Sequence, residues 1–261
     1  MQQIAKEMNY SETTFITSEE KEENNGFDVR IFTPGGEVPF AGHPTLGTAY
    51  VIQQDLIKKP VEKINLNLEV GQIPVRIDYE DGEPQNLIMN QKFPEFNKTF
   101  EVDELAEVLS LEKEDIDGEY PIESVSTGLP FIIVPLKDLK SLKNAEINKD
   151  KYYELIEDLE AKDILIFCPE SHEQKGELSV RVFAEYYGVP EDPATGSANG
   201  CLAGYLIKHN YFGKNKIDIK VEQGYEIGRP SLITLKAEQK PKGIDISIGG
   251  NVIKVAKGQL L

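Results

Sequence analysis

Hydrophobic and polar positions recur along the chain with two periods, the helical spacing and the period-2 alternation of strands. The period-2 segments are more numerous, which predicts a chain in which strands dominate. Residues 1–9 have helical spacing, and a period-2 stretch at 13–17 is followed by a second strand at 27–32. The dipeptide Asn25-Gly26 between these strands, which ends the tract EENNG, is a strong hairpin signal. Helices are expected at 102–109 and 149–160, and further strands at 64–70, 73–79, 86–91, 131–135, 164–167, 178–183, 217–222, 231–237, 244–248 and 252–256.

One unit of this pattern occurs twice. Residues 30–47 and 181–202 each begin with a strand that ends in Arg-x-Phe, continue through a polar turn containing Val-Pro, and reach a small-residue turn with glycine. A Gly/Ala-rich helix follows each turn, at 44–57 and at 198–209, and its small residues favour a position enclosed by sheet. Glycine allows close approach to a ligand, and the first N–H groups of a helix attract anions. The duplication therefore predicts two helix N-termini, just after the turns at Gly42 and Gly196, aimed at one pocket.

The order of elements indicates an α+β fold with two similar halves, each a strand layer wrapped around one helix. The acidic tract at 111–121 has the composition of an inter-domain linker. We therefore expect an N-terminal domain over residues 1–115 and a C-terminal domain over 116–261, with the last strand packing on the first domain.

The composition excludes several classes of protein. A net charge of −17 argues against nucleic-acid binding, which depends on clusters of Lys and Arg. No apolar run is long enough to span a bilayer and no secretory leader is recognisable, so we expect a soluble, cytoplasmic protein without a membrane partner. The two cysteines, Cys168 and Cys201, fit no disulfide framework and no metal-ligand spacing, and are expected to be reduced.

Five separated motifs resemble those of the PhzF family, the phenazine-biosynthesis-type isomerases that share the fold of diaminopimelate epimerase. The motifs are SETTF (11–15), EVPFAGHPTLGTA (37–49), STGLPF (126–131), EDPATGSANG (191–200) and QGYEIGRPS (223–231). They occur in the family's order, and the similarity runs from about residue 2 to about residue 258.

The resemblance implies two epimerase-type domains that face each other across an active-site cleft, no cofactor and no metal, and a homodimer. It also implies relocation of a proton within a small carboxylated substrate. Matched by motif, the family's acid/base residue is Glu12. The other catalytic or substrate-binding positions are His43, Asp192 and Ser197, with Gly42 and Gly196 beside them in the two glycine turns.

The chemistry of these residue types fits proton transfer. Burial in a closed cleft is expected to raise the pKa of Glu12 toward neutrality, where general acid/base exchange works best. The backbone amides of Gly42, His43, Gly196 and Ser197, with the helix dipoles behind them, would stabilise the substrate carboxylate and its enolate-like form.

Each of these residues also has a purely structural interpretation. Glu12 could be a helix-end or capping residue, His43 could cap the helix that follows it, and Asp192 could shape the turn before Pro193. Ser197 could serve as a helix cap while also binding ligand. His172 and His209 are expected to be ordinary surface residues, and Arg229 either pairs with an acidic neighbour or borders the cleft.

Cys201 raises a different possibility, because the epimerase branch of this fold uses two opposed cysteines. In that branch each cysteine immediately precedes the glycine of its turn, where this chain has Ala41 and Thr195. Cys201 instead lies inside the predicted helix and is expected to be a small buried residue.

Three functions remain open from the sequence. The first is a cofactor-independent isomerase that uses Glu12. The second is an epimerase or racemase that uses Glu12 and Asp192 as opposed carboxyl groups. The third is a non-catalytic binding protein that keeps the fold and the dimer.

The two halves differ before their glycine turns. The segment from Ser126 to Gly196 includes an opening strand, and the shorter segment before Gly42 contains no counterpart of it. The family normally begins with such a strand and a Gly-Asn-Pro turn, which are absent here. We therefore expect the first domain to lack its first strand, to have fewer strands than the second and an exposed or differently paired edge near residues 13–17, and to support only weak activity.

Overall fold

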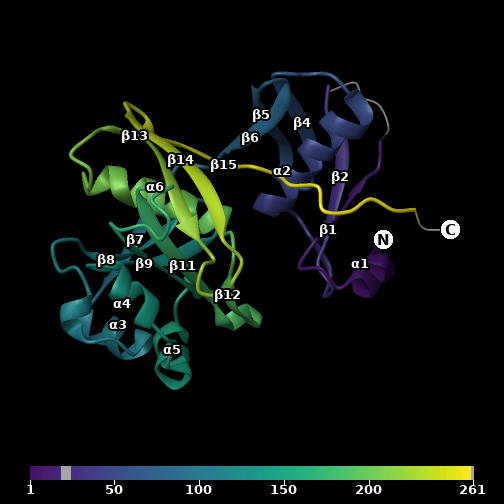
Figure 1. Ribbon diagram of the computed structural model, residues 1–261. Helices are drawn as coiled ribbons and strands as arrows, with labels where there is room; N and C mark the ends of the chain where they lie inside the picture. The colour runs from purple at the N-terminus through teal and green to yellow at the C-terminus, as the bar shows by residue number, and fades with distance from the viewer. Residues whose placement is uncertain (19–24, 260–261) are drawn as a thin grey trace. The chain divides into compact units, whose positions relative to one another are not determined.

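The computed structural model describes residues 1–18 and 25–259, so residues 22–24 of the EENNG tract lie outside the described part. The chain divides into two compact units. The first unit contains Met1–Asn90 and Gly249–Leu261, and the second unit contains Gln91–Ile248. Both mix strands and helices, as Figure 1 shows.

The first unit is a sheet that carries one long helical segment. Its strands are β1 (Thr13–Ile16), β2 (Phe27–Phe32), β3 (Glu37–Val38), β4 (Lys63–Leu68), β5 (Gly71–Glu80) and β6 (Glu83–Asn90). They lie in the order β1-β2-β4-β5-β6, with β3 beside β2. Only the β2/β4 pair among these is parallel. Helix α2 (Gly42–Val51) continues into a π-helix (Ile52–Ile57) and packs into the core of this unit, and α1 is a short helix at Gln2–Met8.

The second unit has a larger mixed sheet. Its strands are β7 (Glu95–Phe100), β8 (Ile122–Ser126), β9 (Pro130–Pro135), β10 (Asp163–Cys168), β11 (Leu178–Ala184), β12 (Val189–Asp192), β13 (Lys216–Gln223), β14 (Ser231–Lys240) and β15 (Gly243–Gly250), whose last two residues belong to the first unit. The order is β15-β14-β13-β11-β10-β9-β8-β7, with β12 beside β11. Its helices are α3 (Val102–Leu109), α4 (Leu139–Asn144), α5 (Lys149–Ile156) and α6 (Gly196–Lys208), with short 3-10 turns at Lys113–Asp115 and Glu185–Tyr187.

Alternating side chains of the second sheet form two separate cores. Leu165 and Phe167 of β10 pack into the core around α6, whereas Ile164 and Ile166 pack into the core that α3, α4 and α5 cover. Because successive residues of a strand point to opposite faces, this unit is a sheet between two layers of helices. The ten-residue run from Ala198 to Ile207 in α6 is buried throughout, which confirms that the small-residue helix is enclosed.

The duplicated unit of the sequence is also duplicated in structure. In the first unit, Arg30 makes two hydrogen bonds to Glu37 (2.7 and 2.6 Å) and lies over the ring of Phe32. In the second, Arg181 makes two hydrogen bonds to Glu191 (3.1 and 2.8 Å) and likewise lies over the ring of Phe183. Strands β2 and β11 are therefore equivalent, residue for residue, around these arginines.

Several sequence-based expectations about the fold are corrected. The tract at 111–121 is not a linker, because Ile116 is buried in the second unit and bridges to Leu136. The two units divide at residues 90 and 91, so residues 91–115, predicted in the first half, lie in the second unit. The reason is that β7, which the sequence pattern did not predict, pairs with β8. The structure likewise adds the short helix α4.

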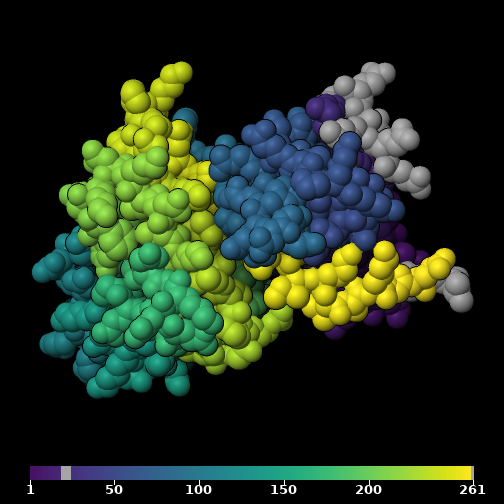
Figure 2. Space-filling view, turned by 45° about the horizontal axis from the view of Figure 1, so that its top comes forward, coloured from purple at the N-terminus to yellow at the C-terminus, as the bar shows by residue number. Residues whose placement is uncertain are grey.

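The C-terminal segment returns to the first unit without forming the strand predicted at 252–256; residues 251–259 have no regular structure. Val252 packs against the first-unit core, and Lys254 Nζ lies 2.9 Å from Asp55 Oδ2 at the end of the helical segment. Figure 2 shows this segment lying along the surface of that unit. This segment therefore contacts the first unit as a loop, where the sequence pattern predicted a strand.

The edge of the first sheet agrees with the expectation from the duplication. In the described part of the chain, β1 pairs only with β2 and ends the strand order, and the first unit has fewer strands than the second. Across the same residues, no helix is long and apolar enough to cross a membrane.

Candidate active site

The first unit brings Glu12 and His43 together at the N-terminus of α2. Glu12 immediately precedes β1, and His43 is the second residue of α2. Glu12 Oε2 lies 3.2 Å from His43 Nε2, an ion pair by distance whose alignment falls short of a hydrogen bond. The Glu12 side chain is 19% exposed and that of His43 is 54% exposed, so the carboxylate is largely sheltered while the imidazole faces solvent.

The pKa of Glu12 is shifted in the direction opposite to the one expected from the sequence. Burial acts to raise this pKa, but the interaction with His43, helped by a hydrogen bond from Ser11, outweighs it and holds the pKa below its ordinary value. The expectation of a raised pKa was therefore wrong, because it counted burial and not the imidazole beside the carboxyl group. Glu12 is therefore ionised at neutral pH and can act as a base.

The N-terminus of α2 offers backbone donors next to this pair. The helix begins at Gly42, not at Pro44 as the proline signal suggested, and Ala41 precedes it without a side-chain cap. The N–H of Thr45 is the first in this helix to donate an i to i−4 hydrogen bond, to Ala41 O at 3.2 Å. The N–H groups of Gly42 and His43 therefore point out of the helix end, where they and the helix dipole favour an anion.

The N-terminus of α6 is built in the same way in the second unit. The helix begins at Gly196 after Thr195, which occupies the N-cap position that the sequence suggested for Ser197. Asn199 N–H is the first to bond back, to Thr195 O at 3.1 Å. Asp192, at the end of β12, accepts a short hydrogen bond from Thr195 Oγ1. This hydrogen bond links the carboxyl group of Asp192 to the N-terminus of α6.

A buried amide pair holds this second helix end in place. Gln223 Nε2 donates to Asp192 O at 2.7 Å and to Thr195 Oγ1 at 3.0 Å. Its Oε1 accepts from Asn199 Nδ2 at 2.8 Å and from Thr195 N at 3.3 Å. Gln223 and Asn199 are both fully buried, so these bonds are shielded from water and fix the turn rigidly.

Gly224 explains how the motif QGYEIGRPS supports this turn. Its φ is +83°, and a Cβ there would lie 2.8 Å from Pro193 O and closer still to Arg229 O. Only glycine lets the chain just after β13 approach the Pro193 backbone this closely. Arg229 itself is exposed, and its backbone N–H donates to Gly224 O at 2.8 Å.

The predicted site residues therefore form two groups, one in each unit. Glu12, His43 and Gly42 meet at the start of α2, and Asp192, Gly196 and Ser197 lie around the start of α6. That the two groups face a common cleft remains a prediction from the duplication.

Sequence reasoning missed Asp163, Gln223 and Asn199. Asp163 is 4% exposed at the start of β10, and its burial, with the charge of Asp192 in addition, raises its pKa to about 7. Aligning the two repeats would have found it, because Asp163 precedes Ile164, which lies opposite Phe183, as Glu12 precedes Thr13, which lies opposite Phe32.

His172 and His209, the two histidines outside the motifs, were expected at the surface, but both side chains are largely buried. The side chain of His172 is 9% exposed; its Nε2 lies 2.7 Å from Glu226 Oε1, and its ring stacks on Tyr225 with centroids 4.3 Å apart. His209 Nε2 lies 2.8 Å from Glu123 Oε2, and only 17% of its side chain is exposed. The charged residues next to these histidines in the sequence suggested that both side chains face solvent. The glutamates that they contact are distant along the chain, so the local sequence did not reveal them.

Both cysteines are free, as expected, and both are buried. Burial raises the pKa of Cys168 to about 11 and that of Cys201 to about 12, so neither is a thiolate at neutral pH. Cys201 lies within α6, in the core, and the sequence-based assignment of this residue as a small buried side chain is confirmed.

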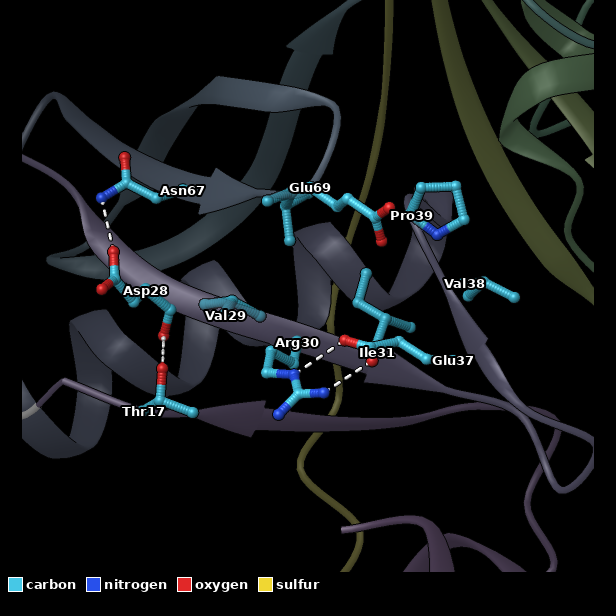
Figure 3. A pocket seen from close by; sticks show the side chains of 11 residues that line it. Thr17, Asp28, Val29, Arg30, Ile31, Glu37, Val38, Pro39, Asn67 and Glu69 are labelled. Carbon is cyan, nitrogen blue, oxygen red and sulfur yellow. Dashed lines mark hydrogen bonds and ion pairs between the residues drawn. The ribbon is translucent and has the colours of Figure 1, made fainter.

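A cavity of about 340 Å³ lies in the first unit, and its lining includes none of the predicted site residues. It is lined by residues of β2, β3, β4 and their flanks, with Asp28, Arg30, Glu37 and Glu69 as its charged side chains. Figure 3 shows that the Arg30 guanidinium is turned toward Glu37. Because its one cation is already paired with a carboxylate, this cavity is poorly suited to a carboxylated ligand.

Known proteins resemble the chain over nearly its whole length. The family model described as phenazine biosynthesis-like protein matches residues 1–258. An uncharacterized isomerase of Clostridium acetobutylicum is 32% identical over 269 residues, which covers 100% of this chain and 87% of that protein. Trans-2,3-dihydro-3-hydroxyanthranilate isomerase of Pseudomonas fluorescens is 32% identical over 266 residues, covering 100% of this chain and 88% of that protein.

A solved structure shows the same fold. The crystal structure of a PhzF-family phenazine biosynthesis protein from Bacillus anthracis matches with a TM-score of 0.86 and 29% identity, over 96% of this chain and 85% of that one. The mixed α/β fold, the family model and the curated relatives agree. The chain therefore belongs to the phenazine biosynthesis-like PhzF family and is an isomerase of that family.

Proposed function

We propose that this isomerase relocates a proton within a small carboxylic acid by general acid/base catalysis through Glu12, without a cofactor. The observation that carries the proposal is the sheltered, ionised carboxylate of Glu12 beside His43 at the N-terminus of α2. A base must be unprotonated before it can act, and the imidazole keeps this one so.

The reaction would proceed in two proton transfers. Glu12 removes a proton from a substrate carbon, and the electron pair of the broken C–H bond moves into the conjugated carboxylate. Glu12 then returns the proton to a different carbon of the same conjugated system, so that a double bond shifts and the enzyme is regenerated. The amides of Gly42 and His43 would stabilise the intermediate negative charge, and Asp192, Gly196 and Ser197 would bind the polar groups of the substrate.

The test is the substitution Glu12→Gln, with Glu7→Gln on the exposed face of α1 as the matched control. The probe is trans-2,3-dihydro-3-hydroxyanthranilate, the compound in the name of the Pseudomonas fluorescens relative. We expect Glu12→Gln to lower the isomerisation rate and deuterium incorporation from D₂O by about 10² to 10⁴. The control should match the wild type, and undiminished exchange in Glu12→Gln would contradict the proposal.

The same experiment separates isomerisation from epimerisation. A shifted double bond in the product supports the isomerase, whereas solvent deuterium entering with loss of configuration supports an epimerase with Glu12 and Asp192 as opposed carboxyl groups. Ligand binding without exchange in the wild type would support a non-catalytic binding protein.

We also propose that the protein is a homodimer, as its family resemblance implies. Light scattering on the purified chain should then give twice the 29.3 kDa of a single copy. A monomeric mass at all concentrations would contradict this.

A further inference from the structure

The open edge of β1 has a covered counterpart in the second unit. In β2 and β11, the phenylalanine of the duplicated Arg-x-Phe sequence lies opposite Thr13 of β1 and Ile164 of β10, respectively, so β1 and β10 are equivalent. On its other side β10 pairs with the parallel strand β9, whereas β1 is the last strand of its sheet in the described residues. All six residues of β10 are buried, and the four residues of β1 are only partly buried. A strand edge of this kind can take up a further strand.

The register of β1 shows which backbone groups face its open edge. The N–H of Thr17 donates to Asp28 O at 2.8 Å, so every second residue counted back from Thr17 bonds to β2. The C=O of Ile16 therefore points away from β2. In the second unit the equivalent residue is Phe167, whose O accepts a hydrogen bond from the N–H of Leu136, just after β9, at 2.8 Å. A parallel strand added beside β1 would meet the same acceptor.

The arginines of the two repeats differ in what covers them. Arg181 Nη1 donates to the carbonyl oxygens of Leu142 and Ala145, at 2.9 and 2.8 Å, at the C-terminal end of α4. Nη1 of Arg30 has no hydrogen-bond partner among the described residues, and the Arg30 side chain is 50% exposed against 9% for Arg181. Figure 3 shows Arg30 at the cavity, with its hydrogen bonds directed to Glu37. Arg30 thus has a free donor where Arg181 holds the end of a helix.

One continuous segment of the second unit covers both the strand edge and the arginine. Residues 130–145 form β9, which pairs with β10, and then α4, whose last carbonyl groups bind Arg181. The last C=O groups of a helix have no partners within the helix, so they are good acceptors for a guanidinium. The equivalent surface of the first unit therefore fits a strand that is followed by a short helix.

The charges around Arg30 favour a basic segment. Asp28, Glu37 and Glu69 line the cavity together with Arg30, and the whole chain has a net charge of −17. Residues 130–145 contain three lysines and one aspartate, so a segment of this composition is opposite in charge to the surface that it would contact. Opposite charges speed the association of two proteins and help to select the partner.

We propose that the open edge of β1 and the free donor of Arg30 form a docking site for a strand-and-helix segment of a separate partner protein. The apolar strand of the partner adds parallel to β1, and the end of its basic helix offers two carbonyl oxygens to Nη1 of Arg30. Val29 and Ile31, on either side of Arg30, pack in the core around α2, so Arg30 projects to the opposite face of the sheet. The helix of the partner therefore lies on the face away from α2.

The probe is the synthetic peptide of residues 130–145, PFIIVPLKDLKSLKNA, with blocked ends and a fluorescent label. Its binding to the full chain is measured by fluorescence anisotropy. We expect saturable binding to the wild type and at least about tenfold weaker binding to Arg30→Gln, because hydrogen bonds from a charged group are lost. Arg76→Gln, at an exposed arginine of β5 in the same unit, is the matched control and should bind like the wild type. No saturable binding to the wild type, or equal affinity for Arg30→Gln, would overturn the proposal.

Variants of the peptide decide the question even if Arg30→Gln does not fold, because they leave the protein unchanged. A peptide that ends at Leu139 lacks both carbonyl groups, so it should bind the wild type about tenfold more weakly than the full peptide does. Replacing Ile132 and Ile133 of the peptide with proline removes two backbone donors of its strand and should abolish binding. Unchanged affinity of either peptide for the wild type would overturn the proposed mode of docking.

A second copy of this chain is the alternative occupant of the site, and light scattering on the protein without peptide tests it. We expect the wild type and Arg30→Gln to have the same mass, because the partner is a different protein. A variant with half the wild-type mass would assign the site to a second copy and overturn the separate partner.

Discussion

Replacing Asp163 with asparagine should change how the stability of the second unit depends on pH. The pKa of Asp163 is about 7 in the folded protein and is 3.8 ordinarily. Between these values the folded state holds a proton that the unfolded state has released, so wild-type stability falls as pH rises through this window. The fall is about 1.4 kcal/mol per pH unit and about 4 kcal/mol in total.

Asparagine cannot ionise, so the stability of the variant does not fall with rising pH through this group. Asp163→Asn should match the wild type near pH 4 and exceed it in stability by about 4 kcal/mol above pH 7. Measurements above the isoelectric point of about 4.7 avoid precipitation. From about pH 5.5 to about pH 8.5, about 2 kcal/mol of the difference should develop.

The assay is urea unfolding followed by far-UV circular dichroism at each pH. The chain has no Trp, and its 11 Tyr provide an independent fluorescence signal. Asp158→Asn is exposed and should give a curve parallel to the wild type. Parallel pH curves for the wild type and Asp163→Asn would refute the reasoning, because they would mean that Asp163 titrates alike in both states.

Three further predictions concern the candidate site. Gln223→Ala should destabilise the protein by about 3 kcal/mol in urea unfolding, because it removes the buried hydrogen bonds of Gln223 to Asn199, Thr195 and Asp192; a loss below about 1 kcal/mol would contradict a rigid role. His43→Ala should raise the pKa of Glu12 in a carboxyl NMR titration, since only the hydrogen bond of Ser11 would then oppose the effect of burial, and an unshifted midpoint would show that the ion pair is unimportant. Cys201 should resist iodoacetamide at pH 8 until the protein is unfolded, and rapid labelling of the native protein would contradict its burial.

The sequence alone determined the local elements and the internal repeat. Helix α3 was predicted over its observed range of 102–109, because its apolar spacing gives one clear buried face. The glycine turns predicted the starts of α2 and α6 to within two residues, because small residues before a helical pattern are a local signal. Glu12 and His43 were assigned to one site only through the family resemblance. In the structure, Glu12 Oε2 and His43 Nε2 lie 3.2 Å apart.

Only the tertiary structure decided which residues are buried and what they meet. Strand β7 has mostly exposed side chains and no clear alternation, so its pairing with β8, and with it the boundary between the units, came from a non-local partner. The pKa of Glu12 depended on whether burial or His43 dominates. Asp163 became visible only through strand register, which sets the face and neighbours of a side chain. Local pattern specifies a strand, but the environment of its side chains is set by residues far away along the chain.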